Sequence, residues 1–417
     1  MRQLIHRPVP MRDGVRLSAD IRLPDGSGPF PALVQRNPYG NANPGNTVRY
    51  VQDGYALVLQ DCRGRFDSEG TFAPFHEAED GFDTLAWVRT QPWCDGRIGM
   101  IGGSYLGTTQ YTAAWLNPPA LRAITPSVMG RDAFKDMLFY QGALHLELCT
   151  GWGFGMIGRA GQSHATTDWK QVHRHLPLLT MDEAAGYDVP YYREWLSHPV
   201  YDGYWRRISV EAHHPDFNLP ILHMGGWYDI YHEGVIRNFT GIRSSGGPLA
   251  RAHQKLIVGP WGHGLNTRAI GALDFGPSAV TNLEALESRW LARWIRDERN
   301  GIDTEAPVRI FVMGANVWRD EQEWPLARAR TMALHLASGG RANSLYGDGA
   351  LTGDPSDGSG ADTYLYNPDN PVPVAGGCVL SPLAGPQDHA PIERRDDVLV
   401  FTGPELLEPL EVTGFVE

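Results

Sequence analysis

The sequence predicts an α/β fold in which a doubly wound parallel sheet is interrupted by a helical insertion and followed by an all-β region. Two observations carry this prediction. Short, nearly continuous apolar runs are typical of parallel strands covered on both faces, and helical stretches such as EDGFDTLAWVRTQ separate several of them. The six runs comprise residues 30–36, 55–61, 97–102, 121–128, 220–226 and 255–261.

Composition narrows the class of protein. With 417 residues, of which 42% are hydrophobic, the chain is long enough for two or three domains. A formal net charge of −12 without a long basic run argues against nucleic acid or an anionic membrane as the main partner. No apolar run reaches the roughly 18 residues of a membrane-spanning helix. We therefore expect a small-molecule substrate, and the composition allows a homo-oligomer.

The cysteines indicate the compartment. Cys62, Cys94, Cys149 and Cys378 are widely scattered and form no CxxC pair. This spacing predicts neither a disulfide framework nor a structural zinc site, and it favours a cytoplasmic location.

The first part of the sheet domain is predicted within residues 1–130. In GVRLSADIRLP, apolar and polar residues alternate at period two after the turn signal RDG, so two antiparallel edge strands are expected around residues 11–24. The parallel strands and their helices follow, and the last strand of this part is LRAITPSV.

Residues 131–219 break this rhythm. The stretch is rich in Trp, Tyr, Phe, Met and His, and we predict a mostly helical cap inserted between two strands, over the strand ends where α/β folds bind ligands. Residues 220–305 then complete the sheet domain with two more strands and the amphipathic helix NLEALESRWLARWIRDER.

Residues 306–417 have an all-β pattern. The segments PVRIFVMG, TMALHLA, DTYLYN and DVLVF alternate with loops rich in Gly, Pro and Asp, which predicts a β-sandwich domain. The last strand, near LEVTGFVE, has no successor to pair with. We therefore expect this sandwich to be incomplete, either as part of a longer polypeptide or with its missing strands supplied by a separate segment.

The stretch RIGMIGGSYLGTTQYTAAWL carries the chemistry. A strand ends at two glycines, presents Ser104 and turns directly into a helix. A serine hydroxyl must lose its proton as it attacks, so it needs a neighbouring base and N–H donors for the oxyanion, which a helix N-terminus can supply. The spacing is GxSxxG, with Leu106 where the common GxSxG elbow of α/β-hydrolases has its second glycine. We interpret Ser104 as a nucleophile; the alternative is an incidental serine in a glycine-rich turn.

The base and its orienting acid are expected after later strands, in the order Ser, acid, His. Asp229 follows the strand ILHMGG, and His263 follows the strand KLIVGPW. Asp61, which also ends a strand, and Glu233 are rivals for the acid, although Asp61 precedes the serine and lies in an arginine- and carboxylate-rich loop. The other histidines show no HExxH or similar spacing, so no metal site is predicted.

Together these motifs resemble a known family. GGSYLG, GGWYD and GPWGH, with RNPYG early and ADTYLYNPDNPVPVAGG late, are similar to the CocE/NonD hydrolases, a group of esterases and acylases related to X-Pro dipeptidyl-peptidases. The resemblance implies an α/β-hydrolase domain with a helical cap and a following jelly-roll domain. It also implies that Ser104 is the nucleophile, Asp229 the acid and His263 the base. The Tyr39 hydroxyl and the backbone N–H of Tyr105 would form the oxyanion hole.

Two departures from the family pattern limit what the resemblance implies. Amino acid ester hydrolases of the family hold the substrate ammonium with acidic residues shortly after the catalytic aspartate, whereas IYHEG follows Asp229 here and leaves Glu233 alone nearby. An α-amino substrate is therefore not expected. The second departure concerns the jelly roll, which has roughly eight strands in the family, whereas this chain offers five strand-like segments after residue 306.

The sequence thus predicts a serine hydrolase without cofactor or metal, acting on a carboxylic ester or on an amide in the manner of an acylase. Aromatic residues of the cap and of the strand-end turns are expected to form an apolar acyl pocket, namely Trp152, Phe154, Trp227, Tyr231 and Trp261. Two alternatives stay open. One is an X-Pro dipeptidyl-peptidase, which would need an acidic anchor for a substrate N-terminus, and the other is a catalytically silent protein that binds carbohydrate or protein.

Overall fold

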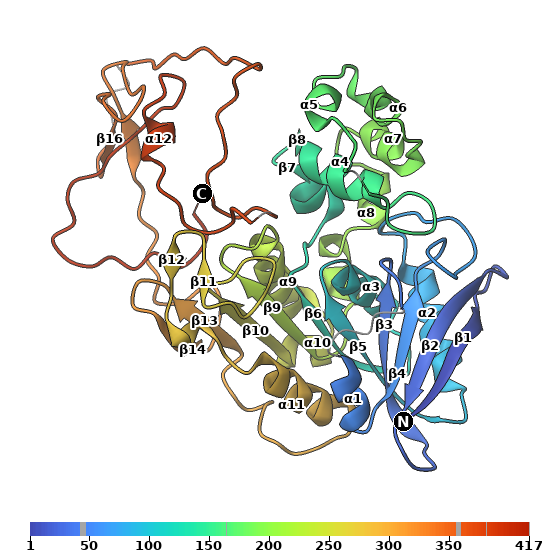
Figure 1. The fold of residues 1–417 in the computed structure, drawn as a ribbon. Helices are drawn as coiled ribbons and strands as arrows, with labels where there is room; N and C mark the ends of the chain where they lie inside the picture. Colours follow the sequence, from blue (N-terminus) through green and yellow to red (C-terminus); the bar gives the residue numbers. More distant parts are fainter. Residues whose placement is uncertain (42–46, 164, 356–359, 381, 417) are drawn as a thin grey trace.

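The computed structural model describes residues 1–41, 47–163, 165–355, 360–380 and 382–416. Its centre is one ten-stranded sheet (Figure 1). In sheet order the strands are β1 (Arg2–Pro10), β2 (Arg16–Leu23), β4 (Ala56–Asp61), β3 (Phe30–Asn37), β5 (Cys94–Gly103), β6 (Leu121–Ser127), β9 (Ile221–Gly226), β10 (Gln254–Gly259), β13 (Val308–Val312) and β14 (Val317–Glu321). The seven strands from β4 to β13 in this order run parallel, and β1, β2 and β14 pair antiparallel at the two edges.

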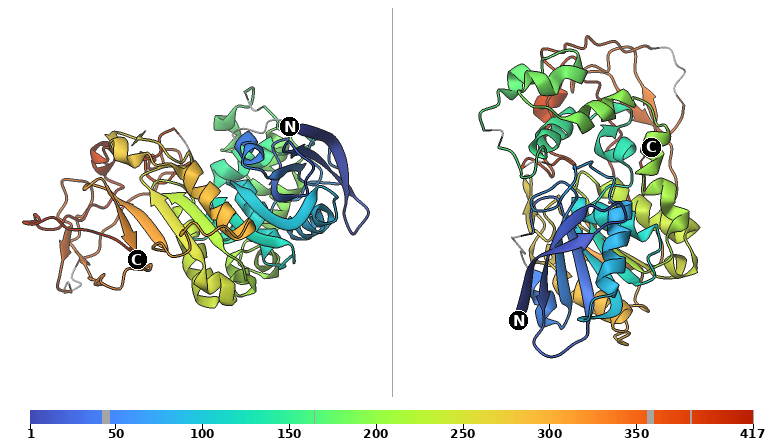
Figure 2. Two further views of the ribbon diagram at one scale, coloured as in Figure 1. Left: turned by 90° about the horizontal axis from the view of Figure 1, so that it is seen from below. Right: turned by 90° about the vertical axis from the view of Figure 1, so that its right-hand side faces the viewer.

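Helices cover both faces of the sheet. One face carries α1 (Val48–Gln52) and α11 (Leu283–Ile295), and the opposite face carries α2 (Ala78–Arg89), α3 (Tyr105–Ala114), α9 (His232–Ser245) and α10 (Pro248–Ala252) (Figure 2). Successive side chains of β10 pack against helices on opposite faces of the sheet. Leu256 and Val258 pack with Val235 of α9, whereas Ile257 between them packs with Trp290 of α11. Strands buried on both faces therefore show continuous apolar runs rather than alternation.

The interval between β6 and β9 is mostly helical and lies above the sheet in Figure 1. Its own core contains the buried side chains of Phe154, Tyr192, Trp195 and Trp205. Its elements are η2 (Ala133–Met137), β7 (Phe139–Tyr140), β8 (Ala143–Leu144), α4 (Leu146–Gly155), α5 (Trp169–Val172), η3 (Leu178–Thr180), α6 (Met181–Ala184), α7 (Pro190–Ser197), α8 (Gly203–Arg207) and η4 (Glu211–Asp216). We refer to residues 131–219 as the cap.

The region after α11 differs from the sequence expectation. The segment PVRIFVMG, expected in the β-sandwich, is β13 of the central sheet, because Val308 and Ile310 pack with the apolar side chains of β10 and α9. Apolar spacing indicates a strand but does not indicate which sheet the strand joins. The other described elements before and within this region are β11 (Ala269–Ile270), β12 (Leu273–Asp274), η5 (Pro277–Ala279), β15 (His335–Ala337), β16 (Ala350–Thr352) and α12 (Ala390–Glu393).

Two other expected strands of this region are absent from the described residues. DTYLYN has no strand conformation, and its Tyr364, Leu365 and Tyr366 are exposed, so no second layer faces them. DVLVF pairs through one isolated bridge, between Leu399 and Asn343, with a backbone hydrogen bond on either side of it. DTYLYN shows no strand partner among the described residues, and the pairing of DVLVF is too short to form a strand.

The N-terminal hairpin also begins earlier than expected. Its first strand is β1, before the turn at residues 11–15, and not within residues 11–24. β1 lacks an alternating pattern because most of its residues are exposed on both sides at the edge of the sheet. Among the described residues, no helix is both long enough and apolar enough to cross a bilayer.

Candidate active site

Ser104 lies in a sharp turn between β5 and α3. Its backbone has φ 57° and ψ −130°, a conformation that L-residues rarely adopt and that the surrounding structure must hold in place. The flanking glycines explain how the turn fits. A Cβ on Gly102 would lie 2.6 Å from the Leu106 Cβ, and a Cβ on Gly103 would lie 2.6 Å from the Ser127 Oγ. The two glycines therefore allow α3 and β6 to approach the turn closely.

Three side chains form a chain of hydrogen bonds at the carboxyl ends of β5, β9 and β10. His263 Nε2 lies 2.9 Å from Ser104 Oγ, and His263 Nδ1 lies 2.7 Å from Asp229 Oδ1. Asp229 is fully buried, whereas the His263 side chain is 23% exposed. A carboxylate on Nδ1 fixes the tautomer in which Nε2 is an acceptor, so this arrangement can move a proton from the serine to the imidazole.

Close packing of the two strand ends positions Asp229 and His263. A Cβ on Gly226 would lie 2.1 Å from the Trp261 carbonyl oxygen, and a Cβ on Gly259 would lie 2.3 Å from the Trp261 ring. The turns after β9 and β10 can therefore touch only because both strands end in glycine. The Trp261 indole is buried beside them and donates a hydrogen bond to the Ala279 carbonyl over 3.0 Å.

Tyr39 reaches the same place from the loop after β3. The Asn37 side chain shapes that loop by accepting a hydrogen bond from the Tyr39 N–H over 2.7 Å and donating one to the Gly40 carbonyl over 2.9 Å. The Tyr39 hydroxyl accepts a hydrogen bond from Trp152 Nε1 over 3.1 Å. Although 45% of the residue is exposed, burial of its hydroxyl end raises the pKa of Tyr39 to about 12. The hydroxyl therefore stays protonated at neutral pH and can donate a hydrogen bond.

Tyr105 contributes through its backbone and is held by its side chain. It is the first residue of α3, so its N–H has no acceptor within the helix. Its buried hydroxyl accepts a hydrogen bond from the Phe75 N–H over 2.8 Å and donates one to Glu77 over 3.1 Å. Burial and the nearby Glu77 carboxylate raise the pKa of Tyr105 well above its ordinary value. The buried Glu77 in turn pairs with Arg36, so an ionic network anchors the residue that follows the serine.

A cavity of about 170 Å³ lies against Ser104 and His263. Its wall is mainly apolar and comes from the sheet domain, from the cap and, through Leu380, from the C-terminal region. The lining residues are Tyr39, Phe75, Ser104, Tyr105, Met129, Met137, Leu138, Leu148, Trp152, Tyr231, His263 and Leu380. Sequence reasoning missed Phe75, Leu380 and the four aliphatic or methionine side chains, because an apolar residue does not show from sequence whether it faces a core or a cavity.

Of the five aromatic residues expected in the acyl pocket, two line this cavity and three do not. Trp152 and Tyr231 line it. Phe154 is buried within the cap, with its ring 5.0 Å from that of Tyr192. Trp227 points toward β13, where its Nε1 donates to the Phe311 carbonyl, and Trp261 is buried beside the turns after β9 and β10. The expectation is wrong for these three residues because their rings pack within the cap or against the sheet and do not face the cavity.

The rival carboxylates are occupied elsewhere. Asp61 is buried, and it accepts hydrogen bonds from the backbone N–H of Asn41 and of Asp67, so it organises a loop. Glu233 pairs with Arg131 over 3.0 Å and also with Arg237. Among the described residues that line the cavity beside Ser104, none carries a carboxylate. In the described parts of the chain, no group of three or more His, Cys, Asp or Glu side chains could hold a metal ion.

Comparison with known proteins adds a family relationship. Residues 13–265 match the X-Pro dipeptidyl-peptidase (S15 family), and residues 300–417 match the X-Pro dipeptidyl-peptidase C-terminal non-catalytic domain. Cocaine esterase from Rhodococcus sp. (strain MB1 Bresler) is 37% identical over 440 residues, which cover 98% of this chain and 75% of that protein.

Two solved structures share the fold. An α-amino acid ester hydrolase labelled with selenomethionine has a TM-score of 0.77 and 24% identity, covering 99% of this chain and 74% of that chain. An aminopeptidase from a marine sediment archaeon, Thaumarchaeota archaeon, has a TM-score of 0.70 and 24% identity, covering 82% of this chain and 61% of that chain.

Proposed function

This chain belongs to the X-Pro dipeptidyl-peptidase (S15) family and, within it, to the CocE/NonD hydrolases, and from that membership we propose that Ser104, His263 and Asp229 are its catalytic triad. Its relationship to cocaine esterase identifies it as a serine hydrolase that cleaves esters. The observation that carries the assignment is the position of His263, hydrogen-bonded to the buried Asp229 on one nitrogen and to Ser104 on the other.

The reaction follows from this geometry. His263 Nε2 takes the proton of Ser104 Oγ as Oγ forms a bond to the carbonyl carbon of the ester, and the carbonyl oxygen becomes an oxyanion. The carbonyl re-forms as the bond to the alcohol breaks, and His263 passes the proton to the leaving alcohol. Water repeats the steps on the acyl-enzyme, releasing the carboxylic acid and restoring Ser104. Asp229 stabilises the imidazolium that exists between these proton transfers.

Tyr39 and Tyr105 are the proposed oxyanion donors. The Tyr39 hydroxyl can rotate from its contact with Trp152 Nε1, where it accepts, and direct its own proton toward the developing negative charge. The Tyr105 N–H stands at the start of α3, where the helix dipole also favours an anion.

The catalytic cavity favours an apolar acyl group about the size of a single aromatic ring. Its volume is about 170 Å³, and apolar protein cavities of roughly 150 Å³ can hold a benzene molecule. Phe75, Met137, Leu148 and Trp152 line it with flat or flexible apolar surface. We propose an ester as the main substrate class and an amide of the acylase type as the second, because the same attack applies to both acyl carbons.

A dipeptidyl-peptidase activity is a weaker candidate. Such an enzyme must bind a substrate ammonium close to the serine, and the described cavity lining offers no carboxylate for it. Glu233, the nearest candidate in sequence, has its charge balanced by Arg131 and Arg237.

We also propose roles for the remaining parts of the chain. The region after α11 would belong to a jelly-roll-like β-sandwich module whose contribution to the site is Leu380. The match of residues 300–417 to the C-terminal non-catalytic domain supports this proposal. A cytoplasmic location is supported by the four cysteines, all of which are free thiols.

An active-site-directed fluorophosphonate tests the assignment, because only an activated serine reacts with it. We expect one covalent adduct on Ser104 and loss of ester hydrolysis by several orders of magnitude in Ser104→Ala. Ser197→Ala, which changes an exposed serine of the cap, is the matched control and should react normally. Labelling of another residue, or full turnover by pure Ser104→Ala protein, would refute the triad.

A further inference from the structure

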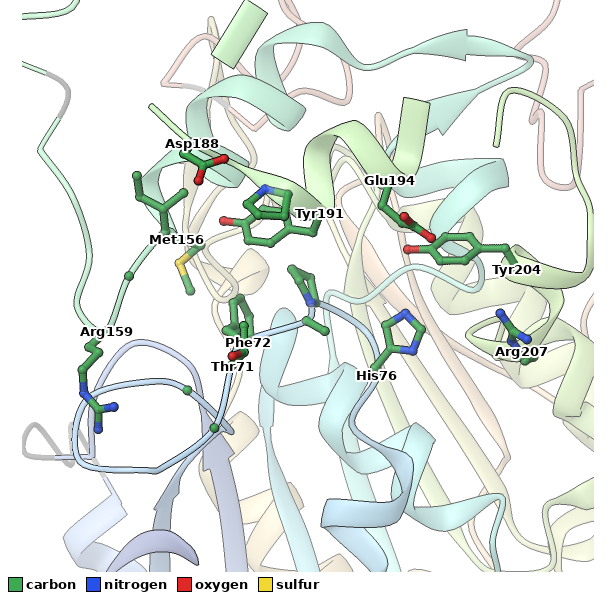
Figure 3. A pocket seen from close by; sticks show the side chains of 17 residues that line it. Thr71, Phe72, His76, Met156, Arg159, Asp188, Tyr191, Glu194, Tyr204 and Arg207 are labelled. Carbon is green, nitrogen blue, oxygen red and sulfur yellow. The ribbon is translucent and has the colours of Figure 1, made fainter. Parts of the chain in front are cut away.

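A second cavity, larger than the catalytic one, lies between the cap and the loop of residues 64–76 (Figure 3). Its volume is about 750 Å³, within the range of roughly 300–1,000 Å³ that is usual for small-molecule sites. None of its lining residues lines the catalytic cavity. The loop itself separates the two, since Pro74 and His76 line the second cavity whereas Phe75 between them lines the catalytic one.

The middle of this cavity is apolar and is formed mainly by two aromatic rings. Phe72 and Tyr191 lie there in Figure 3, with their rings edge to face and their centroids 6.3 Å apart. Tyr191 is fixed because its hydroxyl donates a hydrogen bond to the Gly153 carbonyl of α4 over 2.5 Å. The other apolar lining residues are Ala73, Pro74, Met156, Ile157 and Pro190. Such a surface suits a flat apolar body, because ring faces and edges pack well against aromatic side chains.

Guanidinium groups stand at both ends of the cavity. Arg159 donates hydrogen bonds to the carbonyl oxygens of Phe66 and Ser68, each over 2.8 Å, and neither of these acceptors carries a charge. Arg207 lies at the opposite end in Figure 3, near His76. In the part of the chain that the structure describes, neither arginine forms an ion pair with a carboxylate. Burial and the positive charge of Arg207 lower the pKa of His76, and the carboxylates of Glu79 and Glu194 act on it in the opposite direction.

The two carboxylates of the lining have partners of their own. Asp188 pairs with Arg193, which lies outside the lining, and Glu194 has the His198 ring 3.5 Å away. Arg193 also pairs with Asp182, so it adds no net positive charge here. The lining itself holds two guanidinium groups and two carboxylates, and of these four only the two guanidinium groups lack an ion-pair partner among the described residues. An anion at the Arg207 end would complete an ion pair that the described residues leave open.

We propose that this cavity is a second binding site, for an organic anion with a flat apolar body, of which an aromatic carboxylate is the simplest example. The ring would rest on Phe72 and Tyr191, and the carboxylate would lie at Arg207. The proposal goes beyond ester hydrolysis and needs no chemistry at Ser104.

Calorimetric titration of the wild-type chain with 2-naphthoate tests the proposal, because this acid has no bond for the enzyme to cleave. We expect saturable binding, at least fivefold weaker in Arg207→Gln and unchanged in Arg206→Gln, which alters the neighbouring arginine outside the lining. The neutral analogue 2-naphthalenemethanol should bind at least fivefold more weakly than 2-naphthoate.

Three results would overturn the proposal: no binding of 2-naphthoate, equal binding of the neutral alcohol, or equal binding by wild type and Arg207→Gln. The last result would also be obtained if the acid occupied the catalytic cavity alone. Because the titration measures binding and not turnover, its failure is distinguishable from failure of the catalytic assignment, which the fluorophosphonate experiment tests separately.

Discussion

The Tyr39 hydroxyl stands in the catalytic cavity as an acceptor for Trp152 and as a proposed donor to the oxyanion. Tyr39→Phe removes that donor and keeps the ring. We expect kcat for a p-nitrophenyl ester to fall by about 10²–10³ with little change in KM, because the lost hydrogen bond is stronger in the transition state than in the ground state. Tyr140→Phe, at an exposed position of the cap, should behave as wild type. A change confined to KM would mean that Tyr39 binds substrate instead.

Asp61 gives a pH-dependent stability. Burial raises its pKa from the ordinary 3.8 to about 6, so the folded chain holds this proton more tightly than the unfolded chain does. Stability therefore falls as pH rises from about 4 to 6, by about 3 kcal/mol for this group. Asp61→Asn abolishes that change, and its free energy of unfolding relative to wild type should improve by up to about 3 kcal/mol between pH 4 and 7.

Urea denaturation at the two pH values measures this effect. Asp369→Asn, at an exposed position, is the control and should follow wild type at both. If Asp61→Asn kept the wild-type dependence on pH, the carboxyl of Asp61 would already titrate normally in the folded chain.

At the scale of elements, the ends of β9 and β10 determine the distance between Asp229 and His263. Gly226→Ala would place a methyl group 2.1 Å from the Trp261 carbonyl oxygen and push the two turns apart. We expect a loss of about 1–3 kcal/mol in stability and a fall in kcat of roughly 10²-fold, since displacement of catalytic groups by about 1 Å is that costly.

Gly264, in the turn after β10, offers a matched control. A Cβ on Gly264 would meet nothing within 4 Å, although the residue adjoins His263. Gly264→Ala should therefore keep both stability and kcat. Equal effects of the two substitutions, measured by thermal unfolding and steady-state kinetics, would contradict a role for the close contact at Gly226.

Some elements could be predicted from the sequence and others could not. The central strands were predictable because burial on both faces leaves continuous apolar runs, and the residues that follow those runs pointed to Ser104, Asp229 and His263. The structure joins these three side chains by hydrogen bonds, and their catalytic roles stay predictions. β1 was misplaced because an exposed edge strand has no apolar pattern, and β13 was expected in another sheet because its pattern does not name a partner. Whether an aromatic ring such as Phe154 faces a cavity depends on tertiary packing, which spacing does not encode.

At the scale of the molecule, the cap and the C-terminal region lie at the same end of the sheet (Figure 1), and both contribute residues to one cavity. Cys378 Sγ donates to the Trp227 carbonyl over 3.3 Å, and Leu380 closes the catalytic cavity two residues later. Leu380→Ala should lower kcat/KM for p-nitrophenyl benzoate by about tenfold, since it removes apolar contact worth roughly 0.8 kcal/mol per methylene, and should hardly affect the acetate. Leu407→Ala, at a position 95% exposed, should change neither substrate. Equal losses for benzoate and acetate would show that Leu380 does not contact the acyl group.

The residues that line the catalytic cavity are synthesised at very different times during translation. Tyr39 and Leu380, which both line it, are 341 residues apart in a chain made from its N-terminus onward. At roughly 5–20 residues per second, a ribosome needs about 20–70 s to pass from one to the other. In the later part of that interval, once residue 219 has been made, the nascent chain carries Ser104 and the apolar cap surface but lacks the segment that contains Leu380. We therefore expect chaperones to bind the exposed apolar surface of the nascent chain until the segment that contains Leu380 has been translated.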